Sequence, residues 1–460
     1  MTATTPDTAA EAAVAVGVPW LAARSEPPET GVPAERVAEI MCEEFRELPF
    51  PPHPIALQPF LLPQPEYRQL LDAAAGLLAL LRRSVELSGD GTAERLRELR
   101  LDPADCPYWT EDEQWELRHC ADLARPDVVI GADGPKFVEF NVSGAFGGML
   151  HFQLYQRAWQ RIREAAGLPT FVAVDAYARL ARLIEDTCRD LGTPPAVVLV
   201  GTPREWGPDT PLRHFRQQAD LLRQHGIDAV HLDFEDLLDG IGVLDATGRP
   251  RYRLGIAQFD VHDAELLGYD ISPVRAAQAR GFRLIPSASS WLLHTKRQIA
   301  LLSEGRPWMT AAERELADRY LPWTRLIGDR EVVWQDGDHH LPTLLLQRRE
   351  QFVIKGATGM SGQQVYFGAR TDPVSWAALV TRAMASDNHV AQEVVPAVPM
   401  PVDVLEETGE IVRVVANPVI SPFVVGGAGA GCFGRFVADR RPGIVSALSR
   451  ARLTCLLGQA

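Results

Sequence analysis

One short segment carries polar residues that could bind a metal ion beside a phosphate. Glu139 and Asn141 alternate with apolar residues in the string FVEFNV, so both side chains point to one face of a predicted strand. A carboxylate beside an amide oxygen suits Mg²⁺, which takes oxygen ligands and shares them with substrate phosphates. Asp127, across a predicted hairpin, could add a carboxylate, and Arg125 could hold an acyl phosphate with two hydrogen bonds. Taken alone, each of these is more often a solvated strand residue.

Lysine is scarce in this chain, which has 43 arginines but only Lys136, Lys296 and Lys355. A retained lysine therefore indicates a site that needs a compact ammonium rather than a planar guanidinium. Lys355 ends the predicted strand QFVIK and opens the loop GATGMSGQQ, which lacks the Walker pattern. In that loop Gly359 and Gly362 would let backbone N–H groups close over phosphate oxygens, and an ordinary glycine-rich turn is the alternative. Lys296, at the start of a predicted helix, could supply a second ammonium, although an ordinary surface lysine is the alternative.

Gln392 and Glu393 interrupt the apolar string VAQEVV. Polar side chains in a buried strand need partners, which an adenine amino group or a ribose hydroxyl could provide. An edge strand is the alternative. Two weaker patterns are set aside: DGDHH, at 336–340, is read as a polar turn rather than a metal site, and Cys432 has no recognisable general base.

Composition limits the class of protein. The 460 residues carry a formal net charge of −14 and form no basic stripe, which argues against nucleic acid as a partner. The six cysteines are scattered, with no metal-ligand spacing, so a reduced cytoplasmic setting fits best. No run of 18 apolar residues could span a membrane, and the N-terminus does not resemble a signal peptide.

The elements that must position these residues fall into four predicted regions. Residues 1–35 have no periodicity and are expected to form a disordered tail. Region 36–190 is mostly helical and contains the hairpin of strands 127–130 and 137–140, joined by a turn at 131–135. Within it, Thr110 and Glu113 form a predicted capping box opening a helix through Ala124.

Region 191–285 has a βαβ pattern, with strands near 195–200, 228–232 and 254–259 around a helix at 210–225. Region 286–460 alternates helices and strands around the glycine loop, with late strands at 411–416 and 419–425, and is the predicted nucleotide-binding part. The fold class is therefore α+β, with a helical N-terminal part and an inserted βαβ unit.

These strings resemble a known group of enzymes. RPD followed by FVEFNVSGAFGG is similar to the metal-binding strand of eukaryotic-type glutathione synthetase and of glutathionylspermidine synthetase. FVIKGATGMSGQQVY resembles the ATP-binding strand and loop of that group, and HTKRQIALL its other lysine segment. The metal strand precedes the lysines, which is the permuted order of this group, whereas ordinary ATP-grasp chains place it last. The resemblance covers about 105–440 in outline and is sharp only at these strings.

The resemblance implies an ATP-grasp fold, with 191–285 as its pre-ATP-grasp-like insertion, and the cofactors ATP and Mg²⁺. It assigns roles to residues of this chain as follows: Mg²⁺ ligands Asp127, Glu139 and Asn141; phosphate contacts Lys296, Lys355 and Gln364; adenine hinge Gln392, Glu393 and Val395; a substrate contact at Ser143; and Arg125 at the acyl phosphate. The C-terminal GGAGAGCFGRFV loosely resembles a substrate-covering segment, so Arg413 and Arg435 are expected to contact a phosphate or carboxylate of the substrate, and an ordinary surface position is the alternative. A further acidic ligand in the family's loop is replaced here by Gly359, and no amidase-like region precedes the synthetase part.

The expected activity is an ATP-dependent carbon–nitrogen ligase that joins a small carboxylic acid, such as an amino acid or short peptide, to an amine through an acyl phosphate. The glycine loop and the C-terminal glycine-rich segment would close over it as a lid. A small-molecule kinase and a catalytically silent binding protein of the same fold are the alternatives. The sequence identifies neither substrate, and a homodimer is compatible with it.

Overall fold

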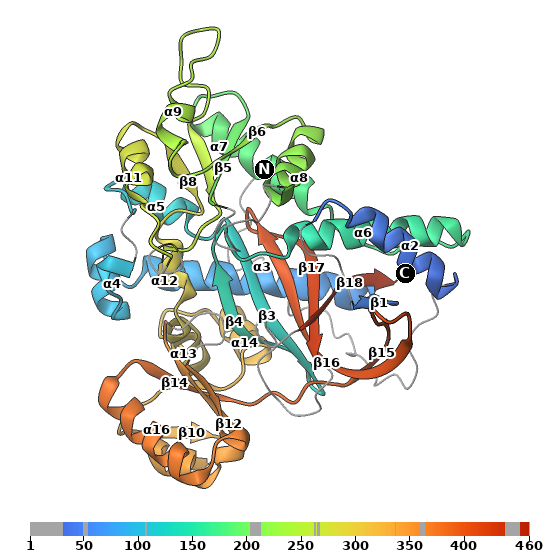
Figure 1. Ribbon diagram of the computed structural model, residues 1–460. Coiled ribbons are helices and arrows are strands. Elements are labelled where there is room, and N and C mark those ends of the chain that lie inside the picture. The colour runs from blue at the N-terminus through green and yellow to red at the C-terminus, as the bar shows by residue number, and fades with distance from the viewer. Residues whose placement is uncertain are drawn as a thin grey trace.

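Three sheets of four or more strands organise the described part of the molecule. The computed structural model describes residues 31–48, 54–105, 108–202, 213–261, 264, 267–335, 337–358, 364–437 and 451–459. A mixed eight-stranded sheet lies in the middle, a parallel four-stranded sheet at one end and an antiparallel four-stranded sheet at the other (Figure 1). Helices and strands are mixed throughout, which confirms the α+β class.

The central sheet collects strands from the beginning, middle and end of the chain. Its strands are β1 (Ile55–Ala56), β2 (Phe60–Pro63), β3 (Leu123–Gly131), β4 (Gly134–Val142), β15 (Met400–Leu405), β16 (Ile411–Val425), β17 (Ala428–Val437) and β18 (Arg452–Gln459). Only β18 and β2 pair in parallel. The other pairs are antiparallel, so β16 has β17 along one edge and β15 followed by β3 along the other.

β16 is one continuous strand where two had been expected. The expected gap between the two strands contains Pro418, which lies between the last residue paired with β15, Ala416, and the first paired with β3, Ile420. A proline is tolerated in a sheet where a neighbouring ladder is interrupted, since its missing N–H is not needed there. The strand can therefore run through both partners.

The expected hairpin is present and longer than its sequence pattern indicated. β3 and β4 are joined by a turn of only two residues, Ala132 and Asp133. Asp127 pairs with Glu139, whereas the next residue of β3 pairs with Phe137, so Val138 is an extra residue that forms a β-bulge. A bulge redirects the residues beside it, and it lets Phe137 and Phe140 both enter the core.

The predicted capping box at Thr110 and Glu113 is wrong. Helix α5 (Glu113–His119) is capped by Asp112, whose carboxylate accepts from the Trp115 amide. The Thr110 hydroxyl donates instead to the Glu116 carboxylate, 3.1 Å away. α5 also ends before the expected boundary, because the chain then enters β3.

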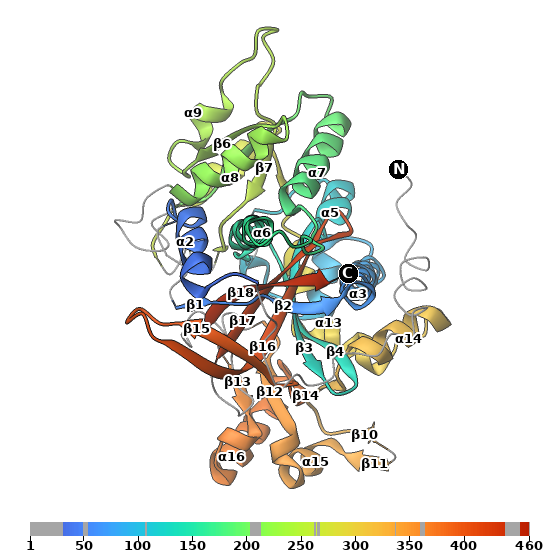
Figure 2. The ribbon, with the colours of Figure 1, turned by 90° about the vertical axis from the view of Figure 1, so that its right-hand side faces the viewer.

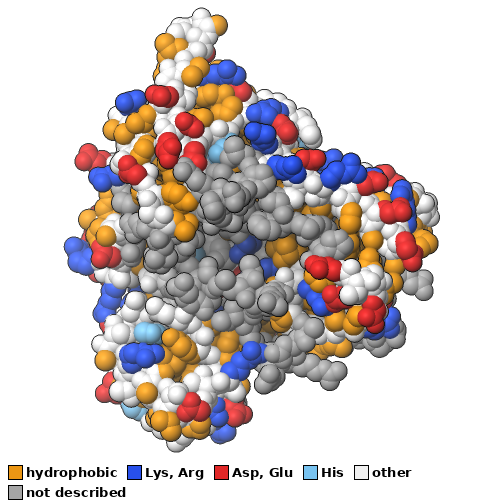
Figure 3. Space-filling model, in the orientation of Figure 1, with side chains coloured by type: hydrophobic (Ala, Val, Ile, Leu, Met, Phe, Trp, Pro, Cys, Tyr) orange, Lys and Arg blue, Asp and Glu red, His pale blue; other side chains and the backbone are white. Residues whose placement is uncertain are grey.

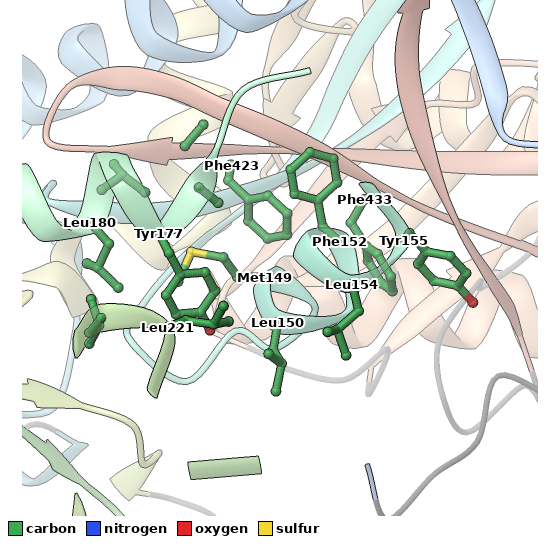
Figure 4. Close-up of a cluster of buried hydrophobic side chains, with 14 of the residues drawn as sticks. Met149, Leu150, Phe152, Leu154, Tyr155, Tyr177, Leu180, Leu221, Phe423 and Phe433 are labelled. Carbon is green, nitrogen blue, oxygen red and sulfur yellow. The ribbon is translucent and has the colours of Figure 1, made fainter. Parts of the chain in front are cut away.

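The other helices of the first part pack around the central sheet. They are α2 (Ala34–Glu44), α3 (Gln64–Glu86), α4 (Thr92–Leu99), α6 (Met149–Ala165) and α7 (Ala176–Asp190). α2 begins inside the expected tail, of which 1–30 lie outside the described residues. The long α3 buries Leu70, Leu77 and Leu81 against β16 and β17. On another side, Met149 and Phe152 of α6 pack with Phe423 of β16 (Figure 4).

The expected βαβ unit is a parallel sheet in the order β6-β5-β7-β8. Its elements are β5 (Ala196–Val200), α8 (Arg213–Gln224), β6 (Asp228–Leu232), α9 (Leu237–Ile241), β7 (Leu254–Ala257), α11 (Ser272–Ala279) and β8 (Arg283–Ile285). Every residue of β5 and β7 is buried, as is usual for parallel strands covered on both faces. Figures 1 and 2 place this sheet at one end of the molecule.

The opposite end holds the antiparallel sheet, in the order β13-β12-β14-β9. Its strands are β9 (Thr324–Leu326), β12 (Phe352–Gly356), β13 (Val365–Phe367) and β14 (His389–Glu393), and a separate hairpin joins β10 (Glu331–Trp334) and β11 (Gly337–His340). Helices α15 (Leu341–Gln347) and α16 (Pro373–Ser386) pack on this sheet, and α13 (Lys296–Glu304) lies against β9. Helices α12 (Ser290–His294) and α14 (Ala311–Tyr320) pack instead on α3 and β4 of the central part. The last four residues of the DGDHH string form the whole of β11, where a polar turn was predicted, and Asp336 lies outside the described residues. Both views show β3 and β4 between the two small sheets.

Two features of the described residues concern the charge of the surface and the apolar character of the helices. On the face shown in Figure 3, basic and acidic side chains are interspersed among the described residues. None of the described helices combines the length and apolar character needed to cross a membrane.

Candidate functional site

The β3–β4 hairpin brings four of the predicted site residues to one face. Asp127 lies opposite Glu139, and Arg125 lies opposite Asn141. Residues two apart on a strand share a face, so the four side chains form two adjacent cross-strand pairs. The Asn141 amide nitrogen donates to the Arg125 carbonyl over 3.0 Å, which fixes this end of the hairpin.

Glu139 forms a buried ion pair with Lys296. The Lys296 Nζ lies 3.0 Å from Glu139 Oε1, and the lysine side chain is only 2% exposed. Burial opposes ionisation of Glu139, but attraction to Lys296 and Lys355 outweighs it and lowers the pKa of Glu139 to about 2. Helix α13 holds Lys296 in place because its first amide donates to the Ala357 carbonyl, just beyond β12.

Lys355 reaches the same hairpin from the end of β12. Its Nζ donates to the Val138 carbonyl over 3.0 Å and to Gln392 Oε1 over 2.8 Å. Val138 is the bulged residue, so the irregularity of β4 turns a backbone acceptor toward the lysine. Burial lowers the pKa of Lys355 to about 8, with attraction to Glu139 opposing the shift and repulsion from Lys296 adding to it.

Asp127 is the centre of a second group of charges. Arg435 of β17 places Nη2 2.6 Å from Asp127 Oδ1, and the buried Ser421 hydroxyl donates to the same oxygen over 2.9 Å. Arg125 lies farther off, with Nε 3.9 Å from that oxygen. Burial lowers the pKa of Arg125 to about 10, and repulsion from Arg435 adds to the effect of burial.

Arg125 also holds the segment that follows β4. Its guanidinium donates to the Phe146 carbonyl, and the Ser143 hydroxyl accepts from the Ala145 amide over 2.9 Å. Gly144 lies directly on the end of β7, where a Cβ atom would be 2.3 Å from the Ala257 carbonyl oxygen. Ser143 therefore stands between the hairpin and the carboxyl edge of the parallel sheet, the edge at which open α/β sheets bind ligands.

The assembled site carries an excess of positive charge. Two lysines and two arginines face only two carboxylates, Asp127 and Glu139, which leaves a formal charge of about +2 when all six are ionised at neutral pH. The Nε atoms of Arg125 and Arg435 are buried without a hydrogen-bond partner. Buried cations need counter-charges, so the arrangement fits a polyanionic ligand.

The residues expected at the adenine lie near Lys355, and each of them makes different contacts. The Gln392 side chain is 2% exposed and contacts Lys355. The Glu393 amide donates to the Trp323 carbonyl, and burial raises the pKa of the Glu393 carboxyl. Val395 lies against the β3–β4 turn, 3.1 Å from where a Cβ on Gly131 would be. The hinge segment is thus next to the site.

The loop predicted to bind phosphate is only partly described. Gly359 and Gly362 lie outside the described residues. Gln364 closes the loop in a left-handed conformation, φ +55°, and its carbonyl accepts from the Gly356 amide over 3.0 Å. A Cβ on Gly356 would lie 2.2 Å from Gln364 Oε1, so the absence of a side chain at Gly356 lets the glutamine amide fold over the end of β12.

Arg413, a predicted substrate contact, and Lys136, the third lysine of the chain, lie away from these side chains. Arg413 pairs with Asp403 on the exposed part of the β15–β16 ladder, with Nε 2.8 Å from the carboxylate. It precedes Ser421 by eight positions, or roughly 26 Å along a strand, so the structure does not bring it to the other site residues. Lys136 of β4 donates to the Asp318 and Arg319 carbonyls at the end of α14. All three lysines of the chain therefore lie on β4 or contact it.

Sequence reasoning missed three groups of this site. Ser421 interrupts an apolar strand, the same signal that drew attention to Gln392. The Val138 carbonyl left no signal, because a bulge depends on the pairing of two strands. His294, two positions before Lys296, is 7% exposed and its Nε2 has no hydrogen-bond partner. Burial lowers the pKa of His294 to about 4, with repulsion from Lys296 adding and attraction to Glu139 opposing.

The donors present fit a magnesium nucleotide better than a metal held by protein alone. Among the described residues, no three His, Cys, Asp or Glu side chains are close enough to bind a metal ion together. Glu139 and the Asn141 amide oxygen provide the kind of partial ligand set that Mg²⁺ completes with phosphate oxygens and water.

Comparison with known proteins gives a fold relationship. No protein-family model matches the chain, and no curated protein sequence matches it. A glutathione synthetase-like effector from Globodera pallida, solved in the apo form, matches with a TM-score of 0.57 at 14% identity, covering 95% of this chain and all of that one. A suspected gamma-glutamylcysteine synthetase from Methylobacillus flagellatus KT gives 0.39 at 12% identity, covering 83% and 87%. The first likeness shows that the chain has a glutathione synthetase-like fold.

Proposed function

We propose that this protein is an ATP-dependent carboxylate–amine ligase of the ATP-grasp type. The observation that carries the proposal is the meeting of Glu139 with Lys296 and Lys355 on one hairpin, in a site with excess positive charge. Two ammonium groups beside a carboxylate match the triphosphate and metal of a magnesium nucleotide.

The group formed by Glu139, Lys296 and Lys355, which we call the lysine end, would bind ATP. Lys296 and Lys355 would neutralise the β- and γ-phosphates, Gln364 and the loop containing Gly359 and Gly362 would cover them, and the Glu393–Val395 segment would line the adenine. Glu139 and Asn141 would hold Mg²⁺, which lowers the repulsion between phosphate oxygens and an incoming anion. Asp127 contacts Arg435 through Oδ1, so only its other oxygen would face a metal.

The group formed by Asp127, Arg125 and Arg435, which we call the arginine end, would bind the carboxylic acid substrate. Arg125 and Arg435 would hold the substrate carboxylate and Ser143 would lie beside the rest of the acid. A carboxylate oxygen then attacks the γ-phosphorus and the bond to the β-phosphate oxygen breaks, giving ADP and an acyl phosphate. Positioning and charge neutralisation supply most of the catalysis in this step.

Amide formation would follow at the carboxyl edge of the parallel sheet. The amine nitrogen attacks the acyl carbon, the carbon–oxygen bond to phosphate breaks, and the nitrogen loses a proton. The two arginines stabilise the negative charge of the departing phosphate. The products are an amide, ADP and inorganic phosphate.

A substrate screen tests this proposal. Purified protein with Mg-ATP is offered pairs of small carboxylic acids and amines, and ADP release and product mass are measured together. A ligase gives an amide whose amount equals the ADP released, and Glu139→Ala abolishes both. A phosphorylated hydroxyl compound formed without any amine would identify a kinase instead, and no nucleotide binding at all would identify a silent binding protein.

A further inference from the structure

A buried chain of polar side chains leads away from Lys355. Lys355 Nζ donates to Gln392 Oε1 over 2.8 Å, and Gln392 Nε2 donates to Thr324 Oγ1 over 3.1 Å. The three residues are 6%, 2% and 0% exposed. A buried side-chain amide with both ends satisfied is held in one orientation.

The orientation of the Gln392 amide follows from its partners. The Thr324 hydroxyl donates its only hydrogen to the Pro322 carbonyl, 2.9 Å away, so toward Gln392 it can only accept. Gln392 must present its nitrogen to Thr324 and its oxygen to Lys355. A flipped amide would put N–H groups against an ammonium, which also can only donate.

The same network reaches the helix that carries the other lysine. The Pro322 carbonyl also accepts from the Ser303 hydroxyl over 3.1 Å, and the Thr324 amide donates to that hydroxyl over 3.0 Å. Ser303 belongs to α13, whose first residue is Lys296. The buried contacts therefore connect Lys355 with the helix that carries Lys296.

We propose that Gln392 is a positioning residue for Lys355. An ammonium has three N–H groups; the Gln392 amide oxygen and the Val138 carbonyl take two, and the third is left for a phosphate oxygen. A neutral amide holds the ammonium without cancelling the charge that phosphate needs. The inference rests on the proposed function and deepens it, because it assigns the Gln392 side chain to the lysine rather than to the adenine.

Two substitutions at Gln392 separate position from charge. Gln392→Met keeps a similar volume but removes the acceptor, whereas Gln392→Glu keeps an acceptor and adds a negative charge. Gln347→Met, at an exposed position on α15, is the matched control. Affinity for ATP is measured by calorimetry with excess Mg²⁺. In the nucleotide-free full-length protein, the acetylation rate of each lysine by acetic anhydride is measured by mass spectrometry.

The two variants should weaken ATP binding alike but change Lys355 in opposite directions. Loss of a hydrogen bond to a charged group is expected to weaken binding about 10- to 100-fold. Gln392→Met should raise the acetylation rate of Lys355, because its ammonium loses a stabilising acceptor, and Gln392→Glu should lower it. Lys136 serves as the internal reference, and Gln347→Met should change neither measurement.

The outcomes distinguish this inference from the proposed function. Unchanged Lys355 rates in both variants, together with weakened ATP binding, would mean that Gln392 contacts the nucleotide directly and would overturn its positioning role. A wild-type protein that binds no Mg-ATP, although its Lys355 rates shift as expected, would overturn the proposed function instead.

Discussion

Two neighbouring groups of charges on the hairpin face have the same charge count but different cations. Glu139 lies near two lysines and Asp127 near two arginines, and the two carboxylates face each other across the paired strands. An ammonium is a compact point charge, whereas a guanidinium is a planar fork that fits two oxygens of one group. The pairing of lysines at one end and arginines at the other is what a site with two different anions requires.

The two ends are also built from different parts of the chain. The lysines come from α13 and β12, which belong to the antiparallel sheet and its helices, whereas Arg435 and Ser421 come from β17 and β16 of the central sheet. The hairpin is common to both. A change at one end should therefore act mainly on one ligand, and the predictions below use that separation.

The largest effect is expected from Glu139→Gln, which removes the carboxylate between the two lysines. Turnover should fall about 10²- to 10³-fold, and the free energy of unfolding should fall by about 3–5 kcal/mol because two buried ammonium groups lose their counter-charge. Product formation and urea denaturation measure the two effects. Glu350→Gln, at an exposed position, is the control and should change neither, and a Glu139→Gln enzyme within tenfold of wild type would remove Glu139 from the mechanism.

Arg435→Lys tests whether the arginine end needs the planar guanidinium, and not only its charge, to bind the ligand. The charge is kept but the fork is lost, so the KM for the acid found in the screen should rise about 10- to 100-fold. The dissociation constant for Mg-ATP should stay within about threefold, since the lysine end is untouched. Equal losses for acid and nucleotide would show that the two ends do not bind separate ligands.

ATP binding at the lysine end should depend on pH because burial lowers the pKa of Lys355 to about 8. Lys355, with a pKa of about 8, must be charged to bind phosphate. Affinity of the free protein for ATP should fall as pH rises through about 8, approaching tenfold per pH unit. The unfolded chain keeps this lysine protonated up to its ordinary pKa of 10.5. The same group therefore makes the free energy of unfolding rise with pH between about 8 and 10.5.

Calorimetry and urea denaturation at several pH values measure these opposite trends. Lys355→Met should remove the contribution to stability. An ATP affinity that is constant from pH 7 to 9.5 would exclude a titrating lysine from the nucleotide site.

The smallest effect is expected from Arg413→Ala. Its partner Asp403 lies on an exposed ladder, and exposed ion pairs contribute about 0–1 kcal/mol. KM values for ATP and acid should stay within twofold of wild type. A selective loss of acid binding would restore the substrate role that the sequence had suggested for this residue.

The sequence anticipated the parts of this site that have a local pattern. Alternation in FVEFNV gave the shared face of Glu139 and Asn141, and the rarity of lysine drew attention to Lys296 and Lys355. The contacts that depend on long-range pairing left no such signal. Ser421 reaches Asp127 across 294 positions, and the acceptor at Val138 arises from a bulge in the register of two strands. The sequence also did not indicate that Arg413 lies away from the other predicted site residues, since a strand pattern does not give the distance of a residue from a site.

The most direct test of the account is a map of lysines labelled by an acyl-phosphate derivative of ATP, a reagent that transfers its acyl group to an amine beside the bound phosphates. With only three lysines in the chain, mass spectrometry assigns every label without ambiguity. We predict labelling of Lys296 or Lys355 that excess Mg-ATP suppresses, and no protected labelling of Lys136. Labelling that Mg-ATP does not suppress, or a protected label on Lys136 alone, would contradict the assignment of the hairpin to a nucleotide site.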